Sequence, residues 1–277
     1  MLRAQSGDTK PPLGSRVTRY EPIVTTPHLG GSTEEAQKNV GIAIARQVAE
    51  FLTKGVIQNA ANAYPLSGET LALVGPYLDV CERMASMAAQ LLVGPPLGMS
   101  VTFHGERFKG DVEMLAASAL KGLLSVAMEG YGVNFVNARA LARERGIEVL
   151  SAQGPEREDF SNLIHVRVES QDDAHEIAGT QFGKQDSRIV RVDGFPLEVK
   201  PQGWVVVTLS ENYPGIIGRM GTIIGRHGGN IHKMNNGCSP DGSRSLSTMS
   251  LDAEPPRAML DELGREPYFR WIRLVHL

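Results

Sequence analysis

From Trp204 to its end, the chain alternates short apolar runs with helical patterns in an order that few folds share. Strands are predicted over 204–209, 229–236, 246–252 and 268–276, and helices from Pro214 to about Arg226 and over 255–264. This β-α-β-β-α-β order is that of the ferredoxin-like split βαβ unit. We therefore expect an α/β (α+β) protein in which residues 203–277 form one complete domain.

The remainder of the chain divides at points where glycine and proline gather. Residues 1–22 lack apolar periodicity and are predicted to be a flexible leader. Helices and strands are interleaved up to Leu150, and short strands predominate from 162 to 200. Pro201 and Gly203 then mark a boundary. The predicted segments are thus a leader (1–22), a first segment with its connector (23–61), a middle domain (62–200) and the ferredoxin-like domain (203–277).

Two of the predicted helices depend on local end signals. Ser32 and Glu35 fit a capping box, which predicts a helix start there. Pro76 is interpreted as a first-turn proline, which predicts that the next helix begins at that residue. Apolar residues recur at helical spacing in both helices, at Val40, Ile44, Val48, Phe51 and Leu52 in the first and at Leu78, Cys81, Met84, Met87 and Leu91 in the second.

Charge, hydropathy and the spacing of cysteines and histidines argue against several classes of function. The formal net charge of -3 gives no general attraction to nucleic acid. No apolar run approaches the roughly 18 residues that span a bilayer, so no membrane partner is expected. Cys81 and Cys238 lie far apart without CxxC spacing, which favours reduced thiols and a cytoplasmic protein. The histidines show no pattern of metal ligands, and no metal site is expected.

One histidine stands in a motif that can carry chemistry. His28 lies on a turn bracketed by Pro27 and Gly30, just before the first predicted helix. A histidine there can act as a general acid or base because its pKa lies near neutrality, although most such histidines are solvated surface groups. The string TPHLGGSTEEAQ resembles the acid/base motif of the D-2-hydroxyacid dehydrogenases, in particular the D-3-phosphoglycerate dehydrogenases. The resemblance implies that His28 exchanges a proton with the substrate hydroxyl while hydride moves to or from NAD.

The same resemblance requires parts that this sequence does not supply. In that family a carboxylate orients the histidine, an arginine binds the substrate, and a Gly-rich domain binds the dinucleotide, all upstream, and only 27 residues precede His28. No G-x-G-x-x-G turn occurs anywhere, and the glycines at 215, 218, 221 and 225 are spaced as a helix packing face. We expect His28 to be a remnant and the chain alone to be inactive, with no cofactor of its own.

A second motif joins the first strand of the ferredoxin-like domain to its helix. It runs Ser210-Glu211-Asn212-Tyr213-Pro214-Gly215, and Asn230 opens the next strand. Backbone N–H groups at a helix N-terminus suit a carboxylate, but Asn and Gly are also ordinary turn residues, so spacing alone leaves both interpretations open.

Residues 203–277 resemble an ACT domain, a module that binds an amino-acid effector across a dimer interface. The resemblance implies a homo-oligomer in which Asn212 and Asn230 contact L-serine while Pro214 and Gly215 shape the loop. Ser210 departs from the His, Tyr or Asn frequent at its position, which leaves the identity of the effector open.

A third group of residues surrounds a predicted hairpin in the middle domain. Lys184, Arg188 and Arg191 are three cations close together, of the type that binds phosphate or carboxylate, although such residues are more often simply solvated. Residues 62–200 resemble the allosteric substrate-binding domain of long-form phosphoglycerate dehydrogenases and of bacterial L-serine dehydratases, through residues 76–78, 133–138, 143–147 and 179–194. The resemblance implies an anionic modulator bound by these three side chains.

These resemblances together favour the regulatory part of a D-3-phosphoglycerate dehydrogenase, truncated or split, with 23–61 a remnant of the catalytic domain. One alternative is an active NAD-dependent enzyme when the chain is joined to, or assembled with, a separate catalytic subunit. Another is a subunit related to L-serine dehydratase. In that alternative the segment TPHLGGST has no place, and the cysteines of an iron–sulfur cluster are missing.

Overall fold

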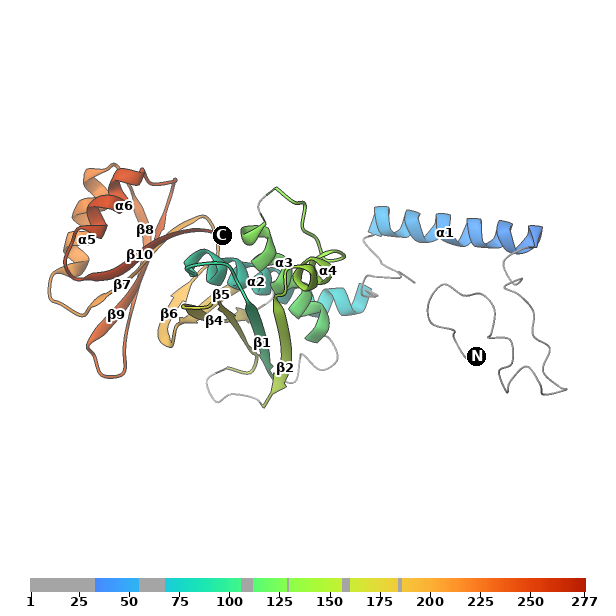
Figure 1. Cartoon of the computed structure of the whole chain (residues 1–277), viewed down its shortest axis with the longest axis horizontal. Helices are drawn as coiled ribbons and strands as arrows, with labels where there is room; N and C mark the ends of the chain where they lie inside the picture. The colour runs from blue at the N-terminus through green and yellow to red at the C-terminus, as the bar shows by residue number, and fades with distance from the viewer. Residues whose placement is uncertain (1–32, 55–67, 106–111, 129, 156–159, 184–185) are drawn as a thin grey trace. The chain divides into compact units, whose positions relative to one another are not determined.

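The computed structural model describes residues 33–54, 68–105, 112–128, 130–155, 160–183 and 186–277. The chain divides into two compact units, Met1–Ser67 and Gly68–Leu277 (Figure 1). His28 and Lys184 lie outside the described residues. No helix in the part that the structure describes combines the length and the apolar character needed to cross a membrane.

In the first unit, α1 spans Glu34–Lys54. The Thr33 hydroxyl accepts a hydrogen bond of 3.2 Å from the Ala36 N–H, so Thr33 caps the helix. Ser32, the predicted cap, lies outside the described residues. The predicted apolar stripe is solvent-exposed on this helix, with Leu52 75% and Val40 57% exposed.

The second unit begins with a sheet of six strands in the order β2-β1-β3-β4-β5-β6. Only β1 and β2 are parallel, and every other pair is antiparallel. The strands are β1 (Gly98–His104), β2 (Glu148–Gly154), β3 (Leu163–Glu169), β4 (Ala174–Phe182), β5 (Asp186–Val192) and β6 (Phe195–Val199).

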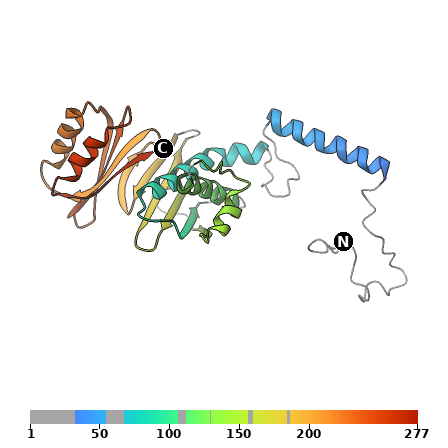
Figure 2. The same ribbon diagram turned by 45° about the horizontal axis from the view of Figure 1, so that its top comes forward.

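Helices α2 (Gly68–Leu91) and α3 (Val112–Ala127) pack on one face of this sheet, and the short α4 (Ala138–Glu144) lies beside α3 (Figure 2). The two long helices approach closely because Gly122 has no side chain. A Cβ at that residue would lie 2.0 Å from the Glu82 carbonyl oxygen. The Ser118 hydroxyl donates to the Leu78 carbonyl at 2.6 Å across the same contact.

The predicted start of α2 is wrong, because Pro76 lies inside the helix rather than in its first turn. Proline removes one backbone donor and does not forbid helix on its N-terminal side. The preceding residues include Leu71, Ala72 and Leu73, whose types favour helix.

The second sheet has four antiparallel strands in the order β10-β7-β9-β8. Helices α5 (Ile216–Arg226) and α6 (Arg257–Gly264) alternate with strands β7 (Trp204–Glu211), β8 (Ile231–Cys238), β9 (Arg244–Leu251) and β10 (Phe269–His276). Its core joins Val206 and Met249 of the sheet to Met220, Ile224 and Leu263 of the helices. The predicted α/β (α+β) class and the ferredoxin-like β-α-β-β-α-β order are confirmed.

The face of this sheet that points away from α5 and α6 is covered as well. Val205, Val207 and Val275 alternate with helix-facing residues and are fully buried. Strand β6 packs against β8 and β9, and α2 packs against β10. The Gln90 carboxamide of α2 donates to the His276 carbonyl and accepts from the His276 N–H, both at 2.9 Å. The two sheets therefore share a continuous packed interface within the second unit.

Candidate effector site

A pocket of about 340 Å³ opens where β7 ends and α5 begins. Three of the residues expected to contact an effector line it together, along with five that were not predicted. The lining residues are Asn212, Tyr213, Pro214, Gly215, Ile216, Ile217, Asn236 and Ser245.

The loop that forms this pocket is fixed to the turn between β8 and β9. The Asn212 N–H donates to the Ser243 carbonyl at 2.9 Å, and the Asn212 side-chain amide donates to the Gly242 carbonyl at 2.9 Å. In that turn, hydrogen bonds from Ser239 and Ser243 lower the pKa of Asp241 to about 2. The ionised Asp241 carboxylate stabilises the turn through these hydrogen bonds, and the turn fixes Asn212 through its two carbonyl groups.

Gly215 gives the loop its direction into the helix. Its φ of 91° lies in the left-handed region, which a glycine adopts without strain, and it is the N-cap of α5. The first N–H groups of α5 therefore face the pocket without helical acceptors, and the helix dipole favours a negative charge there.

Ser210 and Asn230 lie away from the pocket within one chain. Ser210 is fully buried, with its Oγ 3.1 Å from the Oγ of Ser245, so it supports a lining residue. The Asn230 side chain donates a hydrogen bond to Asp252 at 2.8 Å, and Asn230 immediately precedes β8. This end of β8 is paired with Leu251 of β9, which is paired in turn with Trp204 of β7. The pocket lies at the other end of the sheet, some 20 Å away at about 3.3 Å per residue. One chain thus brings Asn212, Pro214 and Gly215 together but not Asn230.

Sequence reasoning missed Asn236 and Ser245. Asn236 accepts a hydrogen bond of 2.6 Å from the Ser247 hydroxyl. Polar residues clustered at one end of the paired strands β8 and β9 were a signal that could have found both, because strands buried on one face by helices usually carry apolar residues there.

At the predicted anion site, carboxylates of the chain itself already pair with one of the cations. Arg188 and Arg191 both lie on β5. Arg188 is mostly buried and pairs with Asp186 at 2.9 Å and Glu198 at 3.4 Å, so two carboxylates already balance its charge. Among the described residues no cluster of His, Cys, Asp and Glu has the arrangement of a metal site.

Comparison with known proteins places part of the chain beside one family of dehydrogenases. Residues 73–193 match the family described as the D-3-phosphoglycerate dehydrogenase intervening domain. A D-3-phosphoglycerate dehydrogenase of Synechocystis sp. is 33% identical over 256 residues, which cover 92% of this chain and 46% of that protein. That of Archaeoglobus fulgidus is 32% identical over 249 residues, covering 89% of this chain and 47% of that protein.

The chain resembles the C-terminal part of the D-3-phosphoglycerate dehydrogenases. It spans about half the length of the curated relatives that it matches. The Bacillus subtilis D-3-phosphoglycerate dehydrogenase is 26% identical over 270 residues, and the chain covers 51% of that protein. The matched intervening domain coincides with most of the first sheet and its helices, and the ferredoxin-like domain follows it. The pocket beside α5 brings together three of the residues that the ACT-domain resemblance assigns to an effector, Asn212, Pro214 and Gly215.

Proposed function

We propose that this chain is the regulatory region of a D-3-phosphoglycerate dehydrogenase of L-serine biosynthesis in the cytoplasm, and that L-serine or a related amino acid binds its ferredoxin-like domain as in an ACT domain. The observation that carries the proposal is the pocket that joins Asn212, Gly215, Asn236 and Ser245 at the N-terminus of α5. The chain's relationship to D-3-phosphoglycerate dehydrogenases supports it, and the dehydratase-related alternative gains no support from the relatives named above.

The pocket offers a suitable partner for each end of an amino acid. Backbone N–H groups in the first turn of α5 would donate hydrogen bonds to the carboxylate. The Asn212 carboxamide oxygen has no donor among the described residues, and it is the acceptor for an ammonium group. The Ser245 hydroxyl, fixed by Ser210, is within the same lining and hydrogen-bonds a small polar side chain such as that of L-serine.

A second copy of the chain completes this site in our proposal. Strand β8 is an edge of its sheet, and its outer side is available for antiparallel pairing with another β8. A two-fold pairing would set Ile231 of one copy opposite Cys238 of the other, since the strand spans Ile231–Cys238. Asn230 of the second copy would then lie opposite Ser239, at the end of the strand that carries Asn236 and the pocket. Asn212 and Asn230, which are distant in one chain, would thus come to the same end of the sheet across the dimer.

Helix α5 supplies a surface for the same contact. Gly218, Gly221 and Gly225 have no atom within 4 Å of the place where a side chain would begin, and Ile217 is 49% exposed. Glycines on one helix face permit close approach of another backbone. The residues that the structure describes thus leave the predicted packing face of α5 uncovered, and a homodimer would cover it.

For the intervening domain we propose a phosphorylated or carboxylate ligand at Lys184, Arg188 and Arg191. Because Asp186 and Glu198 already pair with Arg188, such a ligand would have to compete with them. An effector at either site shifts the equilibrium between two subunit arrangements only if it binds one arrangement more tightly than the other.

Calorimetric titration of the full chain with L-serine tests the proposal. We expect binding that Asn212→Ala and Asn230→Ala each abolish, while Gln153→Ala, which truncates an exposed amide on β2, leaves it intact. Undiminished binding in both asparagine variants would contradict the assigned site. No binding of any amino acid to the unaltered chain would contradict the function.

A second candidate function is a share in catalysis when a catalytic subunit is present. It is favoured by the exposed apolar stripe of α1 and by relatives about twice as long as this chain. The residues that the structure describes do not fit NAD, because neither sheet has a Gly-rich dinucleotide turn. NADH formation from 3-phosphoglycerate that requires an added catalytic subunit and is lost in His28→Ala would support this function. Activity indifferent to that substitution would exclude a role for His28.

A further inference from the structure

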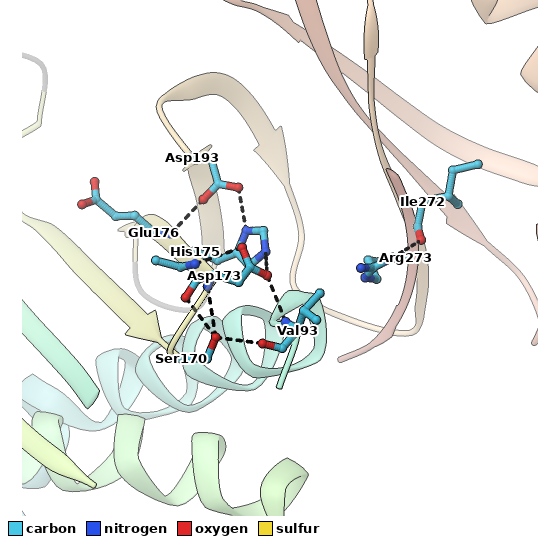
Figure 3. A network of polar contacts seen from close by, with 9 residues as sticks. Val93, Ser170, Asp173, His175, Glu176, Asp193, Ile272 and Arg273 are labelled. Atoms are coloured by element: carbon cyan, nitrogen blue, oxygen red, sulfur yellow. Dashed lines mark hydrogen bonds and ion pairs between the residues drawn. The ribbon is translucent and has the colours of Figure 1, made fainter. Parts of the chain in front are cut away.

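A buried histidine lies at the interface between the intervening domain and the ferredoxin-like domain. His175 is on β4, with its side chain 8% exposed. Figure 3 shows its ring between two carboxylates, and Arg273 of the ferredoxin-like domain lines one of the same pockets. His175 lines two neighbouring pockets between the domains, and no part of the proposed effector site includes it.

Each ring nitrogen of His175 has its own carboxylate. Nδ1 lies 2.7 Å from Asp193, and Nε2 lies 3.3 Å from Asp173. A neutral imidazole carries one N–H and can donate to only one of them. The imidazolium donates to both, so the arrangement is complete only in the protonated form.

The two carboxylates anchor the chain segments around the histidine. Asp193 accepts the Glu176 N–H at 2.8 Å and holds the turn between β5 and β6, where its own φ is 49°. Asp173 accepts the Val93 N–H at 2.9 Å, just beyond α2. Protonated His175 therefore ties together three segments of the intervening domain at the surface that meets the other domain.

Trp271 of β10 completes the contact from the ferredoxin-like domain. Its ring meets the His175 ring edge to face, with centroids 5.8 Å apart and an interplanar angle of 82°. A cation beside an aromatic ring is favoured over a neutral group. The other charged groups that line the two pockets around His175 are Arg167, Asp172, Glu176, Arg244 and Arg273. Of these, Arg273 donates to the Ile272 carbonyl at 3.0 Å.

We propose that protonated His175 is a pH-sensitive contact that holds the ferredoxin-like domain against the intervening domain, and that loss of its proton loosens this docking. The proposal is independent of which effector binds near α5. It identifies hydrogen ion as a second ligand of the regulatory region, acting at a different site.

The direction of the pH dependence follows from the surroundings of the ring. Burial lowers the pKa of His175, but the hydrogen bonds and negative charges of Asp193 and Asp173 outweigh burial and raise the pKa above its ordinary value of 6.5. A raised pKa means that the contact stabilises fully below pH 6.5 and is lost as pH rises through the pKa of the folded protein.

Tryptophan fluorescence measures both parts of the proposal. The chain has two tryptophans, and Trp204 stacks on another histidine, His276. The experiment therefore uses the Trp204→Phe chain, in which Trp271 is the only tryptophan, with excitation selective for indole. Because imidazolium quenches indole emission, we expect emission to rise through one transition with a midpoint above pH 6.5. We expect acrylamide quenching of Trp271 to increase through the same transition as the docking loosens.

Variants identify the titrating group. His175→Gln is expected to abolish the transition. His227→Gln removes a histidine that pairs with Glu262 at 2.7 Å and lines neither pocket around His175, and it is expected to leave the transition unchanged. Asp193→Asn suits the backbone at φ 49° and is expected to move the midpoint to lower pH. A transition that persists in His175→Gln overturns the proposal, as does acrylamide quenching that stays constant with pH. If His175→Gln fails to fold, an unmoved midpoint in Asp193→Asn overturns it.

Discussion

The close contact between α2 and α3 should make Gly122 intolerant of the smallest side chain. A Cβ at Gly122 would lie 2.0 Å from the carbonyl oxygen of Glu82 and 2.8 Å from the carbon that bears it, both rigid backbone atoms. Relief requires the helices to separate by roughly 1.4 Å, which also strains the Ser118 bond to the Leu78 carbonyl. Overpacking of this kind costs up to about 3 kcal/mol, and alanine recovers about 1 kcal/mol through helix propensity.

We therefore expect Gly122→Ala to lower the free energy of unfolding by about 2 kcal/mol, which corresponds to roughly 4–8 °C in Tm for a unit of this size. Thermal unfolding followed by circular dichroism measures the change. Gly264→Ala is the control, because no atom lies within 4 Å of an added Cβ at the end of α6. A Gly122→Ala chain as stable as the unaltered one would refute the packing of these helices.

Two further predictions concern single side chains. Burial raises the pKa of the Cys81 thiol, whereas Cys238 is exposed. An aromatic disulfide reagent should therefore label only Cys238 in the folded chain and both thiols after unfolding. Rapid labelling of both thiols in the folded chain would contradict the buried position of Cys81. Gln90→Ala removes both hydrogen bonds to His276 and should lower the free energy of unfolding by about 1–2 kcal/mol in urea titrations. Gln90→Glu retains the acceptor for the His276 N–H and should lose less; equal losses in the two variants would show that the bond accepted from the His276 N–H contributes nothing.

The fold was predictable from sequence where local chemistry and tertiary packing agree. The apolar strands of the ferredoxin-like domain, with glycines and prolines between elements, indicate one topology and are buried as expected. The start of α2 was not predictable from Pro76, because the same residue is compatible with a first turn and with a helix interior whose neighbours favour helix.

The candidate site was predictable only where its residues are adjacent in sequence. Asn212, Pro214 and Gly215 belong to one loop and line one pocket. Asn236 and Ser245 come from other strands, and their place depends on register, which sequence patterns do not give to the residue. His175 was missed for a related reason, since Asp193 and Trp271 reach it from distant segments.

In the proposed dimer each effector site takes Asn212 from one chain and Asn230 from the other. Calorimetry with L-serine on mixed Asn212→Ala and Asn230→Ala chains, after subunit exchange, tests whether the site is shared. In a mixed two-fold dimer one site has both asparagines and the other has neither, so random exchange of two inactive variants should restore about a quarter of the sites. An equimolar mixture that binds no L-serine, when the unaltered chain does, would contradict a site shared between subunits.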